Sequence, residues 1–197
     1  RQSQGSPTIY DAVFPEMVSH VMQEAGFGHR LHDPDFIHIL GENAKFAGLM
    51  DISGQRIYEL RQKVAEKIGI PTDKLEKMIA PVESVYAIVD HTRCLSYMLG
   101  DCIVPSNAKD GYLARLVLRR TLRMMRELNL PDDKLGDLIE RQMKIIGLSK
   151  FEQDSDVVME IVDREVDKYR TTMERGARTV ERLAQTYKKK CEKIPLD

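Results

Sequence analysis

The chain of 197 residues is 42% hydrophobic and 31% charged, and its 30 Lys and Arg nearly balance its 31 Asp and Glu to a formal net charge of −1. These values are typical of one or two globular domains and exclude a disordered chain, and no apolar run approaches the roughly 20 residues of a membrane helix. Three cysteines are a small and odd number, which argues against a disulfide framework and fits a reducing interior.

Residue usage predicts an all-α fold. The chain has no Trp and only 6% aromatic residues, whereas Met, Leu, Glu, Lys and Arg are plentiful. This balance favours helices over strands, and no segment shows the sustained two-residue alternation of an amphipathic strand. We therefore expect a multi-helix bundle that ends in a long, coiled-coil-like helix.

Start and stop signals divide the first half of the chain into five predicted helices. Polar caps, prolines in the first turn and glycines after the last turn mark their boundaries. In chain order the helices run from Thr8 to Gly26, from Asp33-Pro34 onward, from Ser53 to Gly69, over a short stretch from Thr72, and from Pro81 to about Leu99.

The second half begins with the clearest loop of the chain, residues 100–110, and helices are expected over about 111–128, 132–146 and 154–193. At 1.5 Å per residue the last helix would span roughly 60 Å. Its apolar positions alternate in steps of three and four, so we expect it to pack antiparallel against one or two other helices. This seam consists of Val166, Tyr169, Met173, Gly176, Val180, Leu183 and Tyr187.

Charge is concentrated on the helix after the loop. Between Lys109 and Arg126 six bases accompany a single acid, Asp110. Helical geometry places four of the arginines within roughly 80° of one another, and apolar residues occupy most of the remaining circumference, so we expect a largely buried helix with one guanidinium edge. This arginine stripe consists of Arg115, Arg119, Arg123 and Arg126.

The arginine stripe has two interpretations, and the sequence leaves both open. The guanidinium fork matches phosphate oxygens, which favours a nucleic-acid partner. The alternative is that the acidic segment 127–167 folds onto the stripe and neutralises it within the protein. Bases dominate again from residue 168 to residue 193, and the run Lys188-Lys189-Lys190 is a candidate second contact.

Three charged residues near the stripe are interpreted as structural. Arg120 projects toward the apolar side of its helix, where we expect it to pair with a buried carboxylate such as Asp90. Asp90 and Arg93 are one helical turn apart and are expected to form a local salt bridge.

The sequence contains little that predicts catalysis. His91, Cys94 and Cys102 supply only one tight pair of zinc ligands where a structural site needs two, so no metal site is predicted, and a small metal enzyme is the weaker alternative. There is no phosphate-cradling glycine loop and no Ser/His/Asp pattern. The segment alone is therefore expected not to be an enzyme.

The loop that introduces the arginine helix is the better candidate site. Pro105 stiffens it, and Ser106 and Asn107 carry short polar side chains. One interpretation is that Ser106 or Asn107 caps the helix. The other is that Asn107 contacts a base edge beside the stripe. Proteins reach A-form RNA through its shallow minor groove, where the amino group N2 of guanine is the informative donor and an amide oxygen can accept from it.

Four short motifs follow one another through this region. They are Asp90-His91-Thr92-Arg93, Pro105-Ser106-Asn107, Gly111-Tyr112 and Leu118-Arg119-Arg120. The series resembles the tRNA-recognition region of alanyl-tRNA synthetases. Residues 5–11 and 14–15 look like the archaeal branch of that family just after its third class II catalytic motif, and residues 194–197 look like the lead-in to its next segment.

The resemblance implies a function and a set of site residues. Members of the family join alanine to its tRNA with ATP in the cytoplasm, and they identify that tRNA by a G·U wobble pair near the end of the acceptor stem. Asn107 would read this pair, with Asp197 as a second base-reading residue and Ser106 beside it. The module would act by positioning the tRNA 3′ end for the catalytic domain. Phosphate contacts would come from Arg115, Arg119, Arg123, Arg126, Lys188, Lys189 and Lys190.

The chain has neither an initiator Met nor a signal-peptide pattern, so we expect it to be a piece of a longer protein. The resemblance places ATP and Mg in a catalytic domain before residue 1, and zinc in an editing domain after residue 197. A dimerising C-terminal domain would follow, and the segment itself would be monomeric and inactive, without metal, cofactor or membrane contact.

The partners implied are the tRNA(Ala) acceptor stem and the catalytic and editing domains of the same polypeptide. We expect one helical tRNA-recognition domain over 1–197. A subdivision into linker helices (1–70) and an RNA-binding bundle (71–197) stays open. The alternative function is a helical protein–protein interaction module with no RNA role.

Overall fold

A computed structural model describes residues 5–47 and 54–190. Within these ranges the chain forms eight α-helices and two short 3-10 helices and contains no strand, which confirms the all-α class. The elements are α1 (Ile9–Val13), α2 (Pro15–Glu24), η1 (Gly28–His32), α3 (Pro34–Ala47), α4 (Gly54–Ile68), α5 (Thr72–Gly100), α6 (Lys109–Glu127), α7 (Lys134–Ile146), η2 (Leu148–Lys150) and α8 (Ser155–Lys190). None of these helices combines the length and the apolar content that a membrane span requires.

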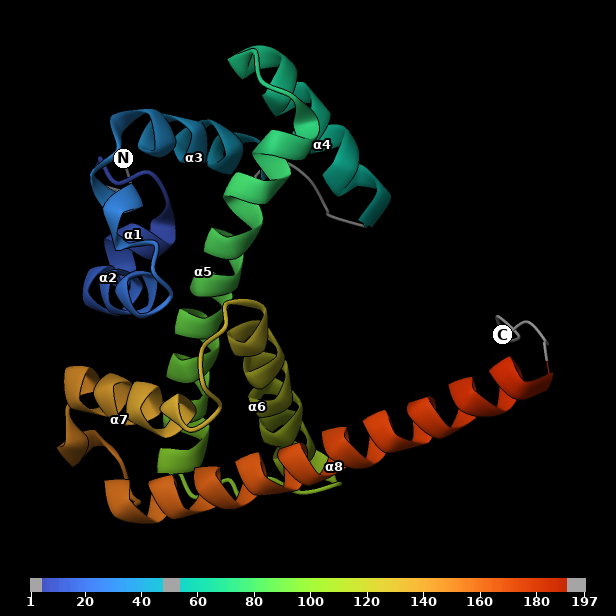
Figure 1. Cartoon of the computed structure of the whole chain (residues 1–197). Coiled ribbons are helices and arrows are strands. Elements are labelled where there is room, and N and C mark those ends of the chain that lie inside the picture. The colour runs from blue at the N-terminus through green and yellow to red at the C-terminus, as the bar shows by residue number, and fades with distance from the viewer. Residues whose placement is uncertain (1–4, 48–53, 191–197) are drawn as a thin grey trace.

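Helix α5 is the axis around which the bundle is built (Figure 1). It contacts α2, α4, α6, α7 and α8, and it is apolar on most sides because partners surround it. Its side chains Ile79, Ile88, Leu95 and Leu99 are fully buried. One apolar cluster contains residues from α2 through α8. The subdivision at residue 70 stays a prediction.

Local signals set the N-terminal boundaries, with one correction. Thr8 caps α1 in a capping box, in which its hydroxyl accepts from the Asp11 amide at 3.3 Å and the Asp11 carboxylate accepts from the Thr8 amide at 3.1 Å. The predicted single helix from Thr8 to Gly26 is wrong, however, because the chain breaks at Phe14 between α1 and α2. Pro15 disfavours helical backbone in the residue before it, so a new helix starts there.

Other boundaries follow the sequence closely. The Asp33 carboxylate accepts from the amides of Asp35 and Phe36 at the start of α3, and Gly69 ends α4 at φ +77°. Ser53 lies outside the described residues. The predicted break at Pro81 is wrong, because α5 runs through it. Proline removes one backbone hydrogen bond, but Ile79 and Val82 on either side lie in the core and hold the helix together.

Helix α8 divides into a packed part and an exposed part. Val158, Val162 and Val166 are buried against the bundle, whereas every described side chain from residue 171 to residue 188 is exposed except the half-buried Tyr187. We call residues 171–190 the arm, which extends away from the bundle in Figure 1. The expectation that the whole seam packs against other helices is wrong, because Val180 and Leu183 are 67% and 49% exposed.

Candidate nucleic-acid interface

The loop between α5 and α6 folds back tightly on the start of α6. The amide of Ser106 donates to the carbonyl of Gly111 at 2.9 Å. The Ser106 hydroxyl donates to the carbonyl of Ala108 at 2.9 Å and accepts from its amide at 3.3 Å. A Cβ atom on Gly111 would lie 2.4 Å from both the Ser106 Oγ and the Val104 carbonyl oxygen, so only glycine permits this approach. The loop therefore has one well-defined shape.

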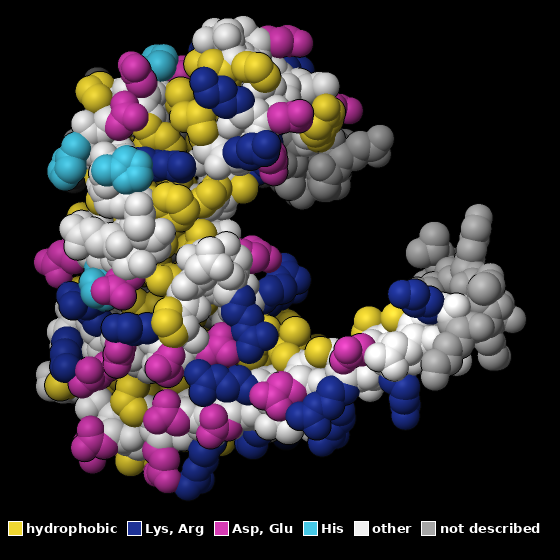
Figure 2. Space-filling view, viewed as in Figure 1, with side chains coloured by type: hydrophobic (Ala, Val, Ile, Leu, Met, Phe, Trp, Pro, Cys, Tyr) yellow, Lys and Arg dark blue, Asp and Glu magenta, His cyan; other side chains and the backbone are white. Residues whose placement is uncertain are grey.

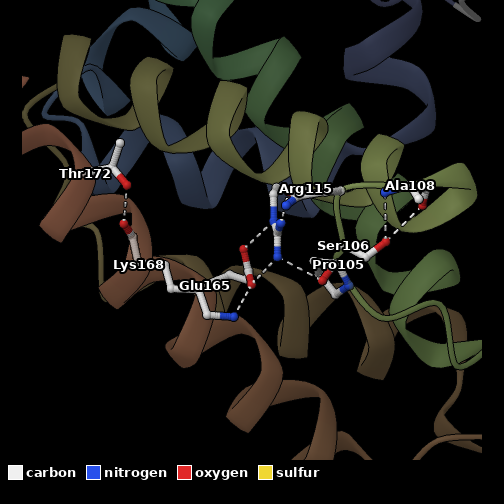
Figure 3. A network of polar contacts seen from close by, with 8 residues as sticks. Pro105, Ser106, Ala108, Arg115, Glu165, Lys168 and Thr172 are labelled. Carbon is white, nitrogen blue, oxygen red and sulfur yellow. Dashed lines mark hydrogen bonds and ion pairs between the residues drawn. The ribbon is translucent and has the colours of Figure 1, made fainter.

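Arg115 of α6 is the centre of a polar network that joins this loop to α8 (Figure 3). Its Nε and Nη2 donate to the two carboxylate oxygens of Glu165, each at 2.9 Å. Nη2 also donates to the carbonyl of Pro105 at 3.0 Å, and Nη1 donates to the Oδ1 atom of Asn107. The Arg115 side chain is 16% exposed and that of Glu165 is 3% exposed. Arg115 is therefore engaged within the protein.

Glu165 is ionised in spite of its burial. Burial raises the pKa of its carboxyl, but hydrogen bonds from Arg115 and Lys168 outweigh that effect, and the pKa lies below its ordinary value. The Lys168 ammonium donates to Glu165 at 2.7 Å from one turn away on α8. Two cations thus compensate one buried anion.

The opposite end of the stripe is also paired. Arg126 makes a bidentate contact with Asp132, with Nε–Oδ1 at 3.0 Å and Nη2–Oδ2 at 2.6 Å. The guanidinium carbon of Arg126 lies 4.7 Å from the ring centroid of Tyr169, and Arg170 donates to Asp132 at 3.4 Å. Hydrogen bonding from Arg126 lowers the pKa of Asp132. Acids from the segment 127–167 therefore neutralise both ends of the stripe, as the alternative interpretation predicted.

Neither of the two middle arginines of the stripe pairs with a buried acid of the described residues. The Arg123 side chain is 71% exposed, and its ion pair with Glu127 has an N–O distance of 3.6 Å between two exposed groups. Arg119 is half-buried, and its Nε atom is buried without a hydrogen-bond partner among the described residues. Figure 2 shows basic and acidic side chains interleaved over the lower part of the bundle.

Asn107 is exposed beside this surface. The capping interpretation of the loop is wrong, because the N-cap of α6 is Ala108 and no side chain caps the helix. Ser106 bonds within the loop instead. The only hydrogen bond of the Asn107 side chain within the described residues is the one that its Oδ1 accepts from Arg115.

The structural assignments of Arg120, Asp90 and Arg93 need correction. Arg120 and Asp90 are both exposed, and no ion pair joins them in the described parts of the chain. Helix α6 buries one face rather than most of its circumference, and Arg120 lies about 200° from the buried Leu118. Arg93 packs its guanidinium over the ring of Phe14, 5.3 Å from its centroid, and does not pair with Asp90.

The weak metal candidates do not form a cluster. His91 is half-buried with Nδ1 at 3.3 Å from the Thr121 hydroxyl, and burial lowers its pKa. The exposed Cys102 thiol contacts Gln153 at 3.2 Å, and Cys94 is a second free, exposed cysteine. No group of three or more His, Cys, Asp or Glu residues able to hold a metal occurs in residues 5–47 and 54–190.

The remaining predicted site residues lie on the arm or beyond it. Lys188 is exposed near the end of α8. Lys189 and Lys190 complete that helix, and Asp197 lies outside the described residues. Glu165 was missed from the sequence, although an acid next to the buried positions Val162 and Val166 was a signal that could have identified it.

Comparisons with known proteins cover the whole chain. Residues 1–197 match the family model described as tRNA synthetases class II (A). The chain is 97% identical over 195 residues to the alanine–tRNA ligase of Methanospirillum hungatei JF-1, and the matched residues make up 99% of this chain and 21% of that protein. It is 63% identical over 194 residues to the alanine–tRNA ligase of Methanoregula boonei, and this match makes up 98% of this chain and 21% of that protein. The chain thus spans about a fifth of the length of these relatives.

Proposed function

Because the chain belongs to the class II (A) tRNA synthetase family, we propose that it is the part of an alanine–tRNA ligase that recognises the acceptor stem of tRNA(Ala). It reads the G·U wobble pair and positions the tRNA 3′ end for alanylation by the catalytic domain of the same polypeptide. In this proposal that domain binds ATP and Mg, the editing domain binds zinc, and the protein works in the cytoplasm. The names and high identities of the relatives support the proposal.

One observation supports the proposed base-reading role of Asn107. The loop before α6 holds Asn107 exposed at the edge of the arginine stripe, in a fixed shape, with its carboxamide held by Arg115. An exposed amide with a fixed orientation is suited to read base edges in the shallow groove of an RNA helix. Asp197 remains the proposed second base-reading residue.

Only two of the four arginines of the stripe are proposed to bind phosphate. Arg119 and Arg123 remain available for RNA, whereas Arg115 and Arg126 are engaged by Glu165 and Asp132. We assign the first two to phosphate binding and the last two to holding the site together. Lys188, Lys189 and Lys190 are a second proposed contact, on the arm.

Binding to acceptor-stem minihelices tests the base-reading role. Minihelices that carry either the G·U pair or a G·C pair are titrated with the chain, with Asn107→Ala and with the exposed-loop control Asp101→Ala. We expect the parent and the control to prefer the G·U helix by about 5- to 100-fold, the range of one good base contact, and Asn107→Ala to lose this preference. A preference that survives in Asn107→Ala would refute the assignment.

Salt dependence tests the phosphate contacts. Arg123→Gln should weaken binding to both helices equally and reduce the slope of log affinity against log salt by roughly 0.7 to 0.9. Arg141→Gln changes another exposed arginine, which lines a different cleft with His20 of α2, and should leave the slope unchanged. An unchanged slope in Arg123→Gln would show that this residue meets no phosphate.

A second candidate function is a helical protein–protein interaction module. The exposed apolar side chains of the arm, Met173, Val180 and Leu183, favour it. The same titrations separate the two functions, because a pure interaction module would bind neither minihelix at any salt concentration.

A further inference from the structure

We propose that Glu165 and Arg115 are a positioning pair that fixes the carboxamide of Asn107, so that its Nδ2 group is presented to RNA as an oriented hydrogen-bond donor. The proposal rests on the proposed base-reading role of Asn107, and it assigns the contact with the RNA to the Nδ2 group of that side chain. It differs from the expectation drawn from the sequence, in which the amide oxygen faced the RNA.

The chemistry of arginine decides which end of the amide faces outward. A guanidinium has five N–H donors and no acceptor. The group that meets Arg115 must therefore be the Oδ1 atom of Asn107, as the contact shows. Nδ2 is the other branch of the same planar amide, on an exposed side chain, and it makes no hydrogen bond to any described residue. It is left as a donor, with one lone pair of Oδ1 beside it.

Arg115 can orient the amide because three other hydrogen bonds hold it in place. Two hydrogen bonds of 2.9 Å bind it to Glu165, and one of 3.0 Å binds it to the Pro105 carbonyl. Glu165 comes from α8, is 3% exposed, and is held in turn by Lys168. A flexible side chain is thus ordered before any ligand arrives, which reduces the entropy lost on binding.

An oriented donor is selective for position. The shallow groove of an RNA helix presents acceptors at purine N3, at pyrimidine O2 and at the ribose 2′-hydroxyl. A wobble pair displaces its pyrimidine relative to a Watson–Crick pair, so the O2 atom moves. Hydrogen bonds weaken steeply when their angle and distance leave a narrow range. A donor that cannot follow the displaced acceptor distinguishes the two pairs, whereas a freely rotating amide would bind both.

A double-mutant cycle tests the pair in the 197-residue chain. The preference for the G·U over the G·C minihelix is measured for the parent, Glu165→Gln, Asn107→Ala and the double variant. Glu165→Gln should reduce the preference at least 5-fold while affinity for the G·C helix stays within about twofold, and it should have no further effect once Asn107 is alanine. The matched control is Glu160→Gln, an exposed acid on the same helix that pairs with Arg164.

Two further variants probe the donor itself and protect the test against misfolding. Asn107→Asp keeps an oxygen for Arg115 but has no N–H to donate, so it should lose the preference as fully as Asn107→Ala. Arg115→Lys keeps a charge for Glu165 but lacks the planar fork that reaches both Glu165 and the loop. It should reproduce the loss even if Glu165→Gln fails to fold.

A measurement without RNA separates this proposal from the proposed function. The side-chain order parameter of the Asn107 amide should be near the value of about 0.85 of rigid backbone in the parent and fall below about 0.6 in Glu165→Gln or Arg115→Lys. A disordered amide in the parent, or independent effects of the two sites in the cycle, would overturn the positioning pair. A parent with an ordered amide and no preference for the G·U helix would instead overturn the proposed function.

Discussion

Two basic regions of the molecule look alike in sequence and differ in structure. The first is the joint between α6 and α8, where Arg115 and Arg126 are bound by Glu165 and Asp132. The second is the arm, which has six bases and two acids over residues 171–190. Its one ion pair between described side chains, Arg178 with Glu174 at 3.4 Å, joins two exposed groups, and such pairs contribute about 0–1 kcal/mol.

The difference lies in what folds onto each run of charge. At the joint, the largely buried acids Glu165 and Asp132 of the segment 127–167 bind Arg115 and Arg126, so these guanidinium groups are engaged within the fold and stabilise the protein. No described element covers the arm, so the charged side chains of residues 171–188 stay solvated and can meet a partner. A basic run therefore predicts a binding surface only where no acid of the fold reaches it.

The largest expected effect comes from breaking the joint. Arg115→Met leaves the carboxylate of Glu165 buried without its main partner, which should cost about 3–5 kcal/mol of unfolding free energy. The matched change in the arm, Arg178→Met, should stay within about 0.5 kcal/mol. Urea unfolding measures both. Equal effects of the two variants would contradict the contrast between joint and arm.

Acid should weaken the joint by protonating its two carboxylates. The folded protein holds the pKa of Glu165 and of Asp132 below their ordinary values of 4.5 and 3.8. Each carboxylate therefore contributes stability above its ordinary pKa, and that contribution is lost as pH falls through the lower folded value. Thermal melting between pH 7 and pH 2 should show a shallower loss in Glu165→Gln than in the parent. If the melting temperatures of the parent and of Glu165→Gln fall in parallel with pH, the ionisation of Glu165 does not contribute to stability.

Removing charge from the arm should change binding and leave stability alone. The triple variant Lys188→Gln, Lys189→Gln, Lys190→Gln should have the melting temperature of the parent. It should reduce the salt slope of minihelix binding by roughly 2.1 to 2.7 if each lysine meets a phosphate. A lower melting temperature would mean that these lysines take part in the fold.

The smallest expected effect concerns the helix of the arm. No atom outside the helix's own local backbone lies within 4 Å of a Cβ added to Gly176, so Gly176→Ala should stabilise the helix locally by roughly 0.5–1 kcal/mol. Hydrogen exchange of the arm amides should slow while urea unfolding of the bundle stays unchanged. A destabilised bundle would show that the arm packs more closely than the structure indicates.

Local signals in the sequence were sufficient for much of the fold and for the position of the loop. Thr8, Asp33 and Gly69 act through hydrogen bonds and backbone angles within a few residues, so they could be recognised without tertiary structure. Pro81 could not be interpreted correctly, because the core contacts that keep α5 continuous at this proline come from other helices.

The partners of the stripe could not be assigned for the same reason. Arg115 and Glu165 are 50 positions apart, and helical periodicity alone does not show which acids of the segment 127–167 reach which arginine. The exposed position of Arg120 required knowing which single face of α6 is buried. The polarity of the Asn107 amide depended on a contact that only the folded loop makes.

The most direct test of the central claim follows the side-chain amide of Asn107 while RNA is added. Its two N–H signals in a nitrogen–proton correlation spectrum are assigned by their loss in Asn107→Ala. Saturation with the G·U minihelix should shift both signals strongly, and saturation with the G·C minihelix should shift them much less. Signals that stay in place when the chain is saturated with the G·U minihelix would contradict the account.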